Sequence, residues 1–344
     1  MLINAPRIFS TARDTHGVSS SHTTSLSLAA ILIASLAFSS ACPSASAQQL
    51  PVMPQPAHAT VGTGTLAIDG GLQVVFEGFH DARLERASDR FFAQLSKRTG
   101  ILRWPVASAS TPKLTLRTTG PDQPVEQLGE DESYHLEVTP QGILLSARNP
   151  LGILHGLQTI LQMLQTSPTG FVLDAATIDD SPRFPWRGLM IDVGRHFMPL
   201  PVIRQNLDLM EAAKLNVFHW HLSDDQGFRI ESKTLPLLQG KGSDGMFYTQ
   251  AQVKDVIAYA YDRGIRVIPE FDMPGHAESW FPGYPGLASG PGPYHIETKW
   301  GIFDPAMDPT RDITYAFLDQ FIGEMTALFP DAYFHIGGDE CNGK

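Results

Sequence analysis

The pattern of hydrophobic and polar residues divides the chain into two parts, which meet at a proline-rich boundary near residues 182–185. In the first part, several short segments alternate between apolar and polar residues, which predicts strands with one buried face. Two longer segments carry apolar residues at helical spacing, which predicts helices. The predicted strands are 113–118, 134–139 and 143–147, and the predicted helices are 81–99 and 151–165. We therefore expect residues 61–181 to form a small α+β domain.

In the second part, strongly apolar segments alternate with helical ones. The predicted strands are 188–193, 216–222, 266–271 and 332–336, and the predicted helices are 200–214, 249–263 and 312–329. Apolar strands joined through helices indicate a parallel sheet covered on both faces. A doubly wound sheet and a (β/α)8 barrel both fit this pattern. Polar residues follow every predicted strand, which favours the barrel because a barrel gathers all its strand ends into one pocket.

The predicted fold class is thus α/β: the small α+β domain followed by a (β/α)8 TIM barrel over residues 182–344. This stretch has 163 residues, whereas such a barrel usually takes about 250. About four of the eight strands expected for this fold are recognisable in the sequence. We therefore expect the chain to be an N-terminal fragment of a longer protein, and we expect the fragment alone to be inactive.

The first 47 residues resemble an export signal. Arg7 and Arg13 precede an apolar run at 26–38, which is too short to span a bilayer comfortably. Residues 45–47 read Ala-Ser-Ala, which fits a signal-peptidase site. We expect residues 1–47 to be removed and the protein to be exported, to the periplasm or outside the cell. An uncleaved anchor is one alternative; a lipoprotein attached at Cys42 is a weaker one, because the residues before Cys42 form a poor lipobox.

Three further features of composition narrow the picture. Residues 48–60 are rich in Pro, Gln and Ala, which predicts a linker. The net charge of −11 argues against nucleic acid or an anionic membrane surface as a partner. Cleavage after residue 47 would leave Cys341 as the only cysteine, so no disulfide within the chain is expected.

The segment from His335 to Glu340 reads His-Ile-Gly-Gly-Asp-Glu and carries two adjacent carboxylates at a predicted strand end. Paired carboxylates suit glycosyl transfer, in which one group gives a proton and charge develops on the sugar. Adjacent residues of a strand point to opposite faces. A turn at the strand end would aim Asp339 and Glu340 into one cleft. The alternative is a solvated acidic pair in a loop.

Two other segments carry candidate chemistry. His219 and His221 share one face of a predicted strand and could bind a metal together with Asp224, or they could line a sugar pocket. Asp272 and His276 follow the next predicted strand and could hydrogen-bond each other and tune a nearby acid. The alternative for this pair is a buried and satisfied structural contact.

Together these segments resemble the family-20 β-N-acetylhexosaminidases, over roughly residues 60–344. The segments that carry the resemblance are 186–188 with Asp192, Arg195 and His196, then 221–229, 270–276 and 335–340. The small domain also resembles the one that precedes the barrel in this family. Phe228 stands where the family often has tryptophan, and because the residue is still aromatic we expect little consequence.

The resemblance implies a role for each matching residue. Glu340 would be the general acid/base, and Asp339 would hold the N–H of the substrate's 2-acetamido group. The acetamido oxygen would attack the anomeric carbon and give an oxazoline intermediate. Arg187 would bind sugar hydroxyls, and the supporting network around Glu340 would consist of Asp225, Asp272 and His276. The resemblance implies no metal and no organic cofactor, and it implies a carbohydrate ending in N-acetylhexosamine as the partner.

Two other functions stay open at this point. One is a metal-dependent barrel hydrolase that uses His219 and His221 with Asp224. The other is a sugar-binding protein without catalysis.

Overall fold

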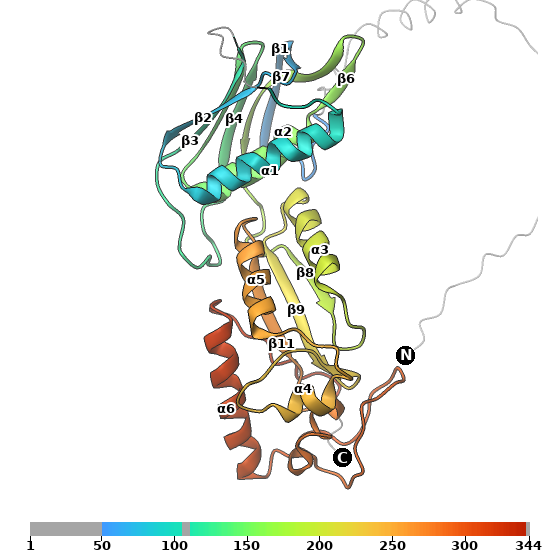
Figure 1. Ribbon diagram of the computed structural model, residues 1–344. Helices are drawn as coiled ribbons and strands as arrows, with labels where there is room; N and C mark the ends of the chain where they lie inside the picture. Colours follow the sequence, from blue (N-terminus) through green and yellow to red (C-terminus); the bar gives the residue numbers. More distant parts are fainter. Residues whose placement is uncertain (1–49, 105–110, 342–344) are drawn as a thin grey trace, which may run out of the picture. The chain divides into compact units, whose positions relative to one another are not determined.

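A computed structural model describes residues 50–104 and 111–341 (Figure 1). The predicted signal segment, with Cys42, lies outside these residues. Within the described part of the chain, none of the helices is both long and apolar enough to cross a membrane.

The first domain contains a seven-stranded sheet. Its strands are β1 (His58–Ile68), β2 (Gln73–Gly78), β3 (Lys113–Thr118), β4 (Tyr134–Thr139), β5 (Gly142–Ala147), β6 (Gln165–Ser167) and β7 (Gly170–Asp180). The order is β1-β7-β4-β5-β3-β2, with β6 pairing to β7; the β2–β3 and β3–β5 pairs are parallel and the others antiparallel. The helices α1 (Ala82–Thr99) and α2 (Pro150–Gln162) lie on one face of the sheet (Figure 1). The prediction of an α+β domain is confirmed.

Local sequence signals explain both helices of this domain. The Asp81 side chain accepts a hydrogen bond from Leu84 N at the start of α1, and Gly100 ends the helix with a left-handed φ of 73°. The Asn149 side chain caps α2 by accepting from Leu151 N. Strand β3 buries alternate residues, as its pattern predicts. Apolar side chains of the sheet and both helices form one core.

The described part of the predicted linker is instead part of this domain. Leu50 and Val52 are buried in its core, and the backbone N–H of Met53 donates to Gln162 Oε1 at 2.7 Å. Strand β1 begins at His58. The prediction of a linker over 48–60 is therefore wrong for these residues: two apolar side chains among prolines are enough to anchor the segment.

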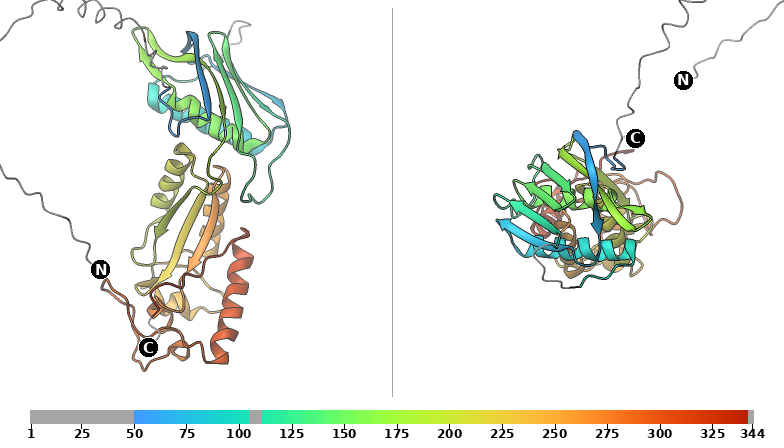
Figure 2. Two further views of the ribbon diagram at one scale, coloured as in Figure 1. Left: turned by 180° about the vertical axis from the view of Figure 1, so that it is seen from behind. Right: turned by 90° about the horizontal axis from the view of Figure 1, so that it is seen from above.

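The second part of the chain forms a four-stranded sheet with parallel strands in the order β8-β9-β11. Its strands are β8 (Gly188–Asp192), β9 (Val217–Asp224), β10 (Gly227–Phe228) and β11 (Arg266–Phe271), with β10 antiparallel to β9. Its helices are α3 (Leu200–Ala212), α4 (Leu237–Gly242), α5 (Gln250–Tyr261) and α6 (Asp312–Leu328), with 3-10 turns η1 (Glu278–Trp280) and η2 (Pro285–Leu287). Figures 1 and 2 show α3 and α5 on one face of the three parallel strands. This is the beginning of a (β/α)8 barrel.

The fourth predicted strand is reduced to a single bridge. His335 pairs in parallel with Glu270 on β11. Three backbone hydrogen bonds continue the pairing: His335 N donates to Pro269 O at 3.0 Å, Phe271 N to His335 O at 3.1 Å, and Met273 N to Ile336 O at 3.0 Å. Residues 332–336 therefore run beside β11 as predicted, and bring the Asp339-Glu340 segment to the same edge as the ends of the other strands.

Aromatic side chains dominate the core of the second part. Phe228 is fully buried and packs edge-on against Trp280 with ring centroids 5.0 Å apart. Phe271 and Phe321 belong to the same cluster. Phe228 is therefore a core residue, which explains why phenylalanine can stand where the family often has tryptophan.

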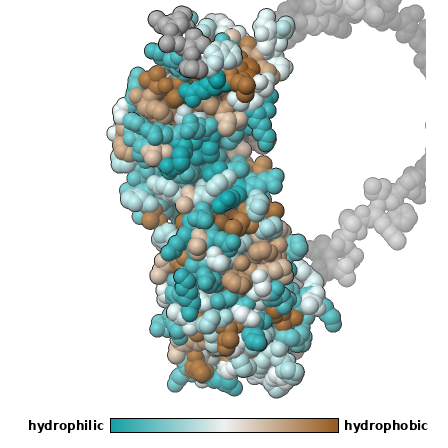
Figure 3. Space-filling model, in the orientation of Figure 1, coloured by the Kyte–Doolittle hydropathy of each residue, from teal (hydrophilic) through white to brown (hydrophobic). Residues whose placement is uncertain are grey.

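Hydrophobic side chains reach the surface in Figure 3 at separate places among polar ones. Single exposed apolar residues are normal on a folded domain. The hydrophobic surface on this face therefore needs no special explanation.

Candidate active site

Asp339 and Glu340 lie after the bridge at His335, and their side chains converge. One oxygen of each carboxylate and one ring nitrogen of His276 all lie within 4.8 Å of one another. The backbone turns sharply here, since Gly337, Gly338 and Glu340 all have positive φ, of 68°, 104° and 51°. This turn is what lets two adjacent residues face the same space, because in an extended strand they would point to opposite sides.

The first of the two glycines is required by a close approach. A Cβ atom at Gly337 would lie 1.7 Å from Asp272 Oδ1, whereas a Cβ at Gly338 would have no heavy atom within 4 Å. The Gly338 N–H donates to the same Asp272 oxygen at 3.1 Å. Asp272 thereby holds the turn that carries Asp339 and Glu340.

Replacing Gly337 with alanine should displace this turn. We expect Gly337→Ala to lower kcat/KM by roughly 10-fold or more in the full-length protein, since catalytic groups tolerate only about 0.5 Å of displacement. Gly338→Ala is the matched control: it also places a Cβ at a positive φ, of 104°, but with no heavy atom within 4 Å, and should lose less activity. Equal kinetics for the two variants on a chromogenic substrate would contradict this account of the turn.

His276 connects Glu340 to the buried carboxylate of Asp225. Its Nε2 lies 3.1 Å from Glu340 Oε2, and its Nδ1 lies 3.1 Å from Asp225 Oδ2. Burial opposes protonation of His276, but the nearby Asp224, Asp225 and Asp272 more than offset it, so the pKa of His276 is raised. The arrangement can hold a positive charge on the imidazole beside Glu340.

Asp272 is almost completely buried, and burial raises its pKa to about 7, with the charge of Asp339 adding to the shift. The ionised form of Asp272 is therefore disfavoured up to neutral pH. Asp339, by contrast, is exposed in this structure. Burial likewise raises the pKa of Asp225.

Arg195 extends this network on the side of β8. Its guanidinium lies 2.7 Å from Asp192 and 2.9 Å from Asp224, and its Nη2 is 3.5 Å from His276 Nδ1. Asp224 is fully buried and also contacts His221 Nε2 at 2.9 Å. Arg195 is thus the arginine that the structure places beside the predicted site residues.

Arg187 lies at the other end of the barrel strand. It precedes β8, and its side chain contacts Glu132 of the first domain and the carbonyl oxygens of Lys214, at 2.8 Å, and Phe184, at 2.8 Å. The structure therefore does not bring Arg187 together with Asp339 and Glu340, and the prediction that it binds sugar hydroxyls is corrected. A residue before a strand belongs to the amino end of the barrel, where stability rather than catalysis is expected.

The two histidines of β9 do not share Asp224. His219 Nε2 lies 2.6 Å from Glu270 Oε2, and His221 Nδ1 lies 2.8 Å from the same oxygen. Burial opposes ionisation of Glu270, but its contacts with His219 and His221 dominate and lower its pKa. The two histidines belong to different groups of described residues that are close enough to hold an ion. His219 is grouped with Glu270 and His335, and His221 is grouped with Asp192 and Asp224. The three residues of the alternative metal site, His219, His221 and Asp224, are therefore not gathered into one group.

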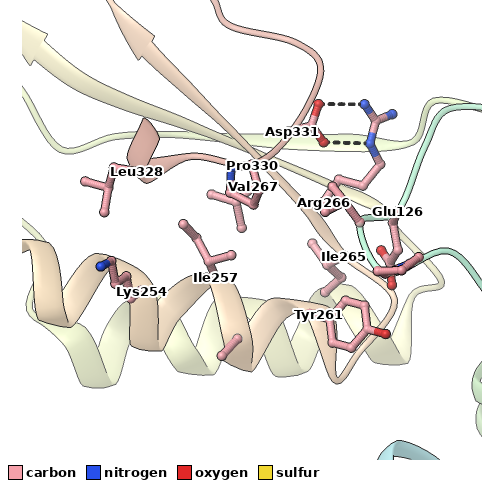
Figure 4. Close-up of a pocket in the computed structure, with 13 residues that line it drawn as sticks. Glu126, Lys254, Ile257, Tyr261, Ile265, Arg266, Val267, Leu328, Pro330 and Asp331 are labelled. Atoms are coloured by element: carbon pink, nitrogen blue, oxygen red, sulfur yellow. Dashed lines mark hydrogen bonds and ion pairs between the residues drawn. The ribbon is translucent and has the colours of Figure 1, made fainter. Parts of the chain in front are cut away.

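A separate pocket of about 320 Å³ lies away from this site (Figure 4). Apolar side chains of α5 and β11, including Ile257 and Val267, form its wall. The Arg266 guanidinium is held by both oxygens of Asp331, at 2.8 Å each, at one end. None of the predicted site residues lines this pocket.

A carboxylate pair, a supporting histidine and an arginine at the carboxyl ends of parallel barrel strands are typical of glycoside hydrolases. Comparison with known families gives the same class. Residues 184–344 match the catalytic domain of glycosyl hydrolase family 20, and residues 49–181 match domain 2 of the same family. The chain belongs to glycosyl hydrolase family 20.

Individual relatives agree with this assignment. The chain is 45% identical to the mouse β-hexosaminidase subunit beta over 216 residues, which are 62% of this chain and 40% of the mouse protein. A Flavobacterium johnsoniae chitobiase structure matches with a TM-score of 0.79 at 42% identity, covering 85% of this chain and 45% of that one. A mutant Streptomyces plicatus β-hexosaminidase in complex with product GlcNAc matches with a TM-score of 0.74 at 33% identity, covering 84% and 59%. The chain thus spans 40% of the length of the mouse relative.

The sequence motif includes both Arg187 and Arg195, and the resemblance implied sugar binding for Arg187, whereas the structure places Arg195 beside His276. The signal that distinguishes them is position: Arg195 follows β8 and Arg187 precedes it. Asp224, to which the sequence assigns no role beyond a possible metal ligand, is the buried contact shared by Arg195, His221 and, at 3.4 Å, His276.

Proposed function

We propose that the protein is a retaining exo-β-N-acetylhexosaminidase, which removes terminal N-acetylglucosamine or N-acetylgalactosamine. The observation that carries the proposal is the convergence of Asp339, Glu340 and His276, with Asp225 behind the histidine. The names of the relatives, β-hexosaminidase and chitobiase, and the GlcNAc complex of one of them support the substrate class.

In the proposed mechanism, Glu340 first acts as an acid. It gives its proton to the glycosidic oxygen while the carbonyl oxygen of the substrate's own 2-acetamido group attacks the anomeric carbon. The bond to the leaving group breaks, and an oxazoline forms. An intramolecular nucleophile is effective because it is already held next to the reacting atom. Water, deprotonated by Glu340, then opens the oxazoline from the opposite side, so the product retains its configuration.

Asp339 accepts a hydrogen bond from the acetamido N–H and stabilises the positive charge that develops on this nitrogen. Asp272, largely protonated below its pKa of about 7, leaves Asp339 as the charged member of that pair. The Asp225–His276 pair orients Glu340, whose φ of 51° is unusual for a glutamate. We assign the binding of sugar hydroxyls to Arg195, which its contacts with Asp192 and Asp224 hold in place.

We further propose that residues 50–344 alone are inactive and that activity needs the remaining strands of the barrel. In the described residues, β8 pairs only with β9, and the inward-facing Met190 of β8 is 51% exposed. The side chain of Glu340 is 49% exposed. Closure of a barrel removes such open edges and surrounds the substrate.

One experiment tests both statements. The full-length protein should hydrolyse a chromogenic N-acetyl-β-glucosaminide, and NMR of the first product should show the β-anomer; residues 50–344 expressed alone should release no product. An α-anomer would exclude the retaining mechanism, and no hydrolysis by the full-length protein would favour the sugar-binding alternative. Substantial turnover by residues 50–344 would show that the remaining barrel strands are not needed.

A further inference from the structure

Trp300 is the most exposed of the large hydrophobic side chains in the described part of the chain, at 86%. It belongs to the long loop between β11 and α6, which lies at the carboxyl end of the barrel strands, near the chain's C-terminal end (Figure 1). A single exposed apolar residue needs no explanation by itself. The contacts of the loop around this tryptophan are what give it significance.

The backbone on the amino side of Trp300 is fixed to the turn that carries Asp225. The Gln226 side-chain amide donates to Lys299 O at 2.8 Å, and Glu297 N donates to Asp225 O at 3.1 Å. Both bonds join the loop to residues that directly follow β9. Trp300 is therefore held in position relative to the Asp225–His276–Glu340 network, although its own ring is open to solvent.

The ring of Trp300 also contacts this network through Arg195. The guanidinium carbon of Arg195 lies 5.2 Å from the centroid of the Trp300 ring, within the range of a cation–π interaction. The same guanidinium is 3.5 Å from His276 Nδ1, and His276 Nε2 is 3.1 Å from Glu340. The exposed ring thus borders the site, while the carboxylates that support the site are buried.

We propose that Trp300 is a specificity-determining platform for the aglycone, meaning the part of the substrate that leaves. This inference rests on the proposed function. The terminal sugar must approach the buried network to be cleaved, so an exposed ring at the border meets the portion that projects outward. An indole offers a large apolar face that packs against the C–H groups of a second pyranose ring. Trp300 therefore favours an aglycone that is itself a sugar.

The test compares two substrates in the full-length protein. N,N′-diacetylchitobiose has a sugar aglycone, whereas methyl N-acetyl-β-glucosaminide has one too small to cover an indole. We expect Trp300→Ala to lower kcat/KM for diacetylchitobiose by about 10-fold, mainly through KM, as loss of one aromatic contact predicts. Turnover of the methyl glycoside should change by less than about 2-fold. Trp300→Phe should recover most of the loss, because it restores an aromatic face.

Trp104→Ala, which removes a partly exposed tryptophan of the first domain, is the matched control and should affect neither substrate. Unchanged kcat/KM for diacetylchitobiose in Trp300→Ala, or equal losses on both substrates, would overturn the platform and leave the proposed function standing. If the unaltered protein hydrolyses neither glycoside, the proposed function fails and the platform with it.

Discussion

Replacing Glu340 with glutamine should lower kcat by about 10²–10⁴-fold on substrates with a poor leaving group, which is the usual contribution of a general acid. Glutamine keeps the size of the side chain and its contact with His276, but has no proton to give to the glycosidic oxygen. The measurement is the steady-state hydrolysis of diacetylchitobiose by the full-length protein. The loss should appear in kcat and in kcat/KM alike, since proton transfer occurs only in the transition state.

The leaving group provides an internal control for this prediction. Formation of the oxazoline from a nitrophenyl glycoside should be slowed much less, because a nitrophenolate departs without a proton. Glu77→Gln, on the half-exposed β2 of the first domain, should leave both substrates unaffected. If Glu340→Gln slowed the two substrates equally, Glu340 would not be the acid, and the proton would have to come from another group.

The sequence was most informative where each element depends on its own residues. Alternating strands, capped helices such as α1 and the order of the four motifs predicted both domains and the barrel class. The convergence of Asp339 and Glu340 could also be predicted in outline, since two glycines before two acids indicate a turn. Gly337 in particular has no space for a Cβ, because Asp272 lies against it. These two residues are 65 positions apart in the chain, so the contact has no local signal in the sequence.

The incorrect predictions have the same cause, because each depends on contacts between residues that are distant in the sequence. The segment around Leu50 and Val52 has the composition of a linker, and only the core of the folded domain shows that these two side chains are buried. Residues 332–336 have the pattern of a strand, but in the described residues their pairing with β11 is limited to one bridge at His335 and the hydrogen bonds beside it. Arg187 has a side chain suited to a sugar, but its position before β8 directs it to Glu132 and the first domain.

In the proposed mechanism Asp339 carries the negative charge next to the substrate nitrogen, and Asp272 lies behind it in a largely uncharged form. Asp272 has a pKa raised to about 7 by burial and, in addition, by the charge of Asp339. Removing the charge of Asp339 should therefore lower the pKa of Asp272, so the ionised form of Asp272 would appear at lower pH in such a variant. Asp272 is held by Gly338 N and lies behind the turn, so it would not replace Asp339 at the acetamido group.

Asp339→Asn should accordingly reduce kcat by about 10²–10³-fold in the full-length protein, as loss of one preorganised electrostatic contact to a developing charge predicts. KM should change much less, because the contact strengthens only when positive charge forms on the acetamido nitrogen. A thiazoline, which imitates the oxazoline, should inhibit the unaltered protein strongly and the variant weakly. Asp89→Asn, on the exposed side of α1, is the matched control and should behave like the unaltered protein. A variant whose KM rises while kcat and thiazoline inhibition stay the same would show that Asp339 only binds the substrate, and the nucleophile would then have to be sought among the carboxylates of the enzyme.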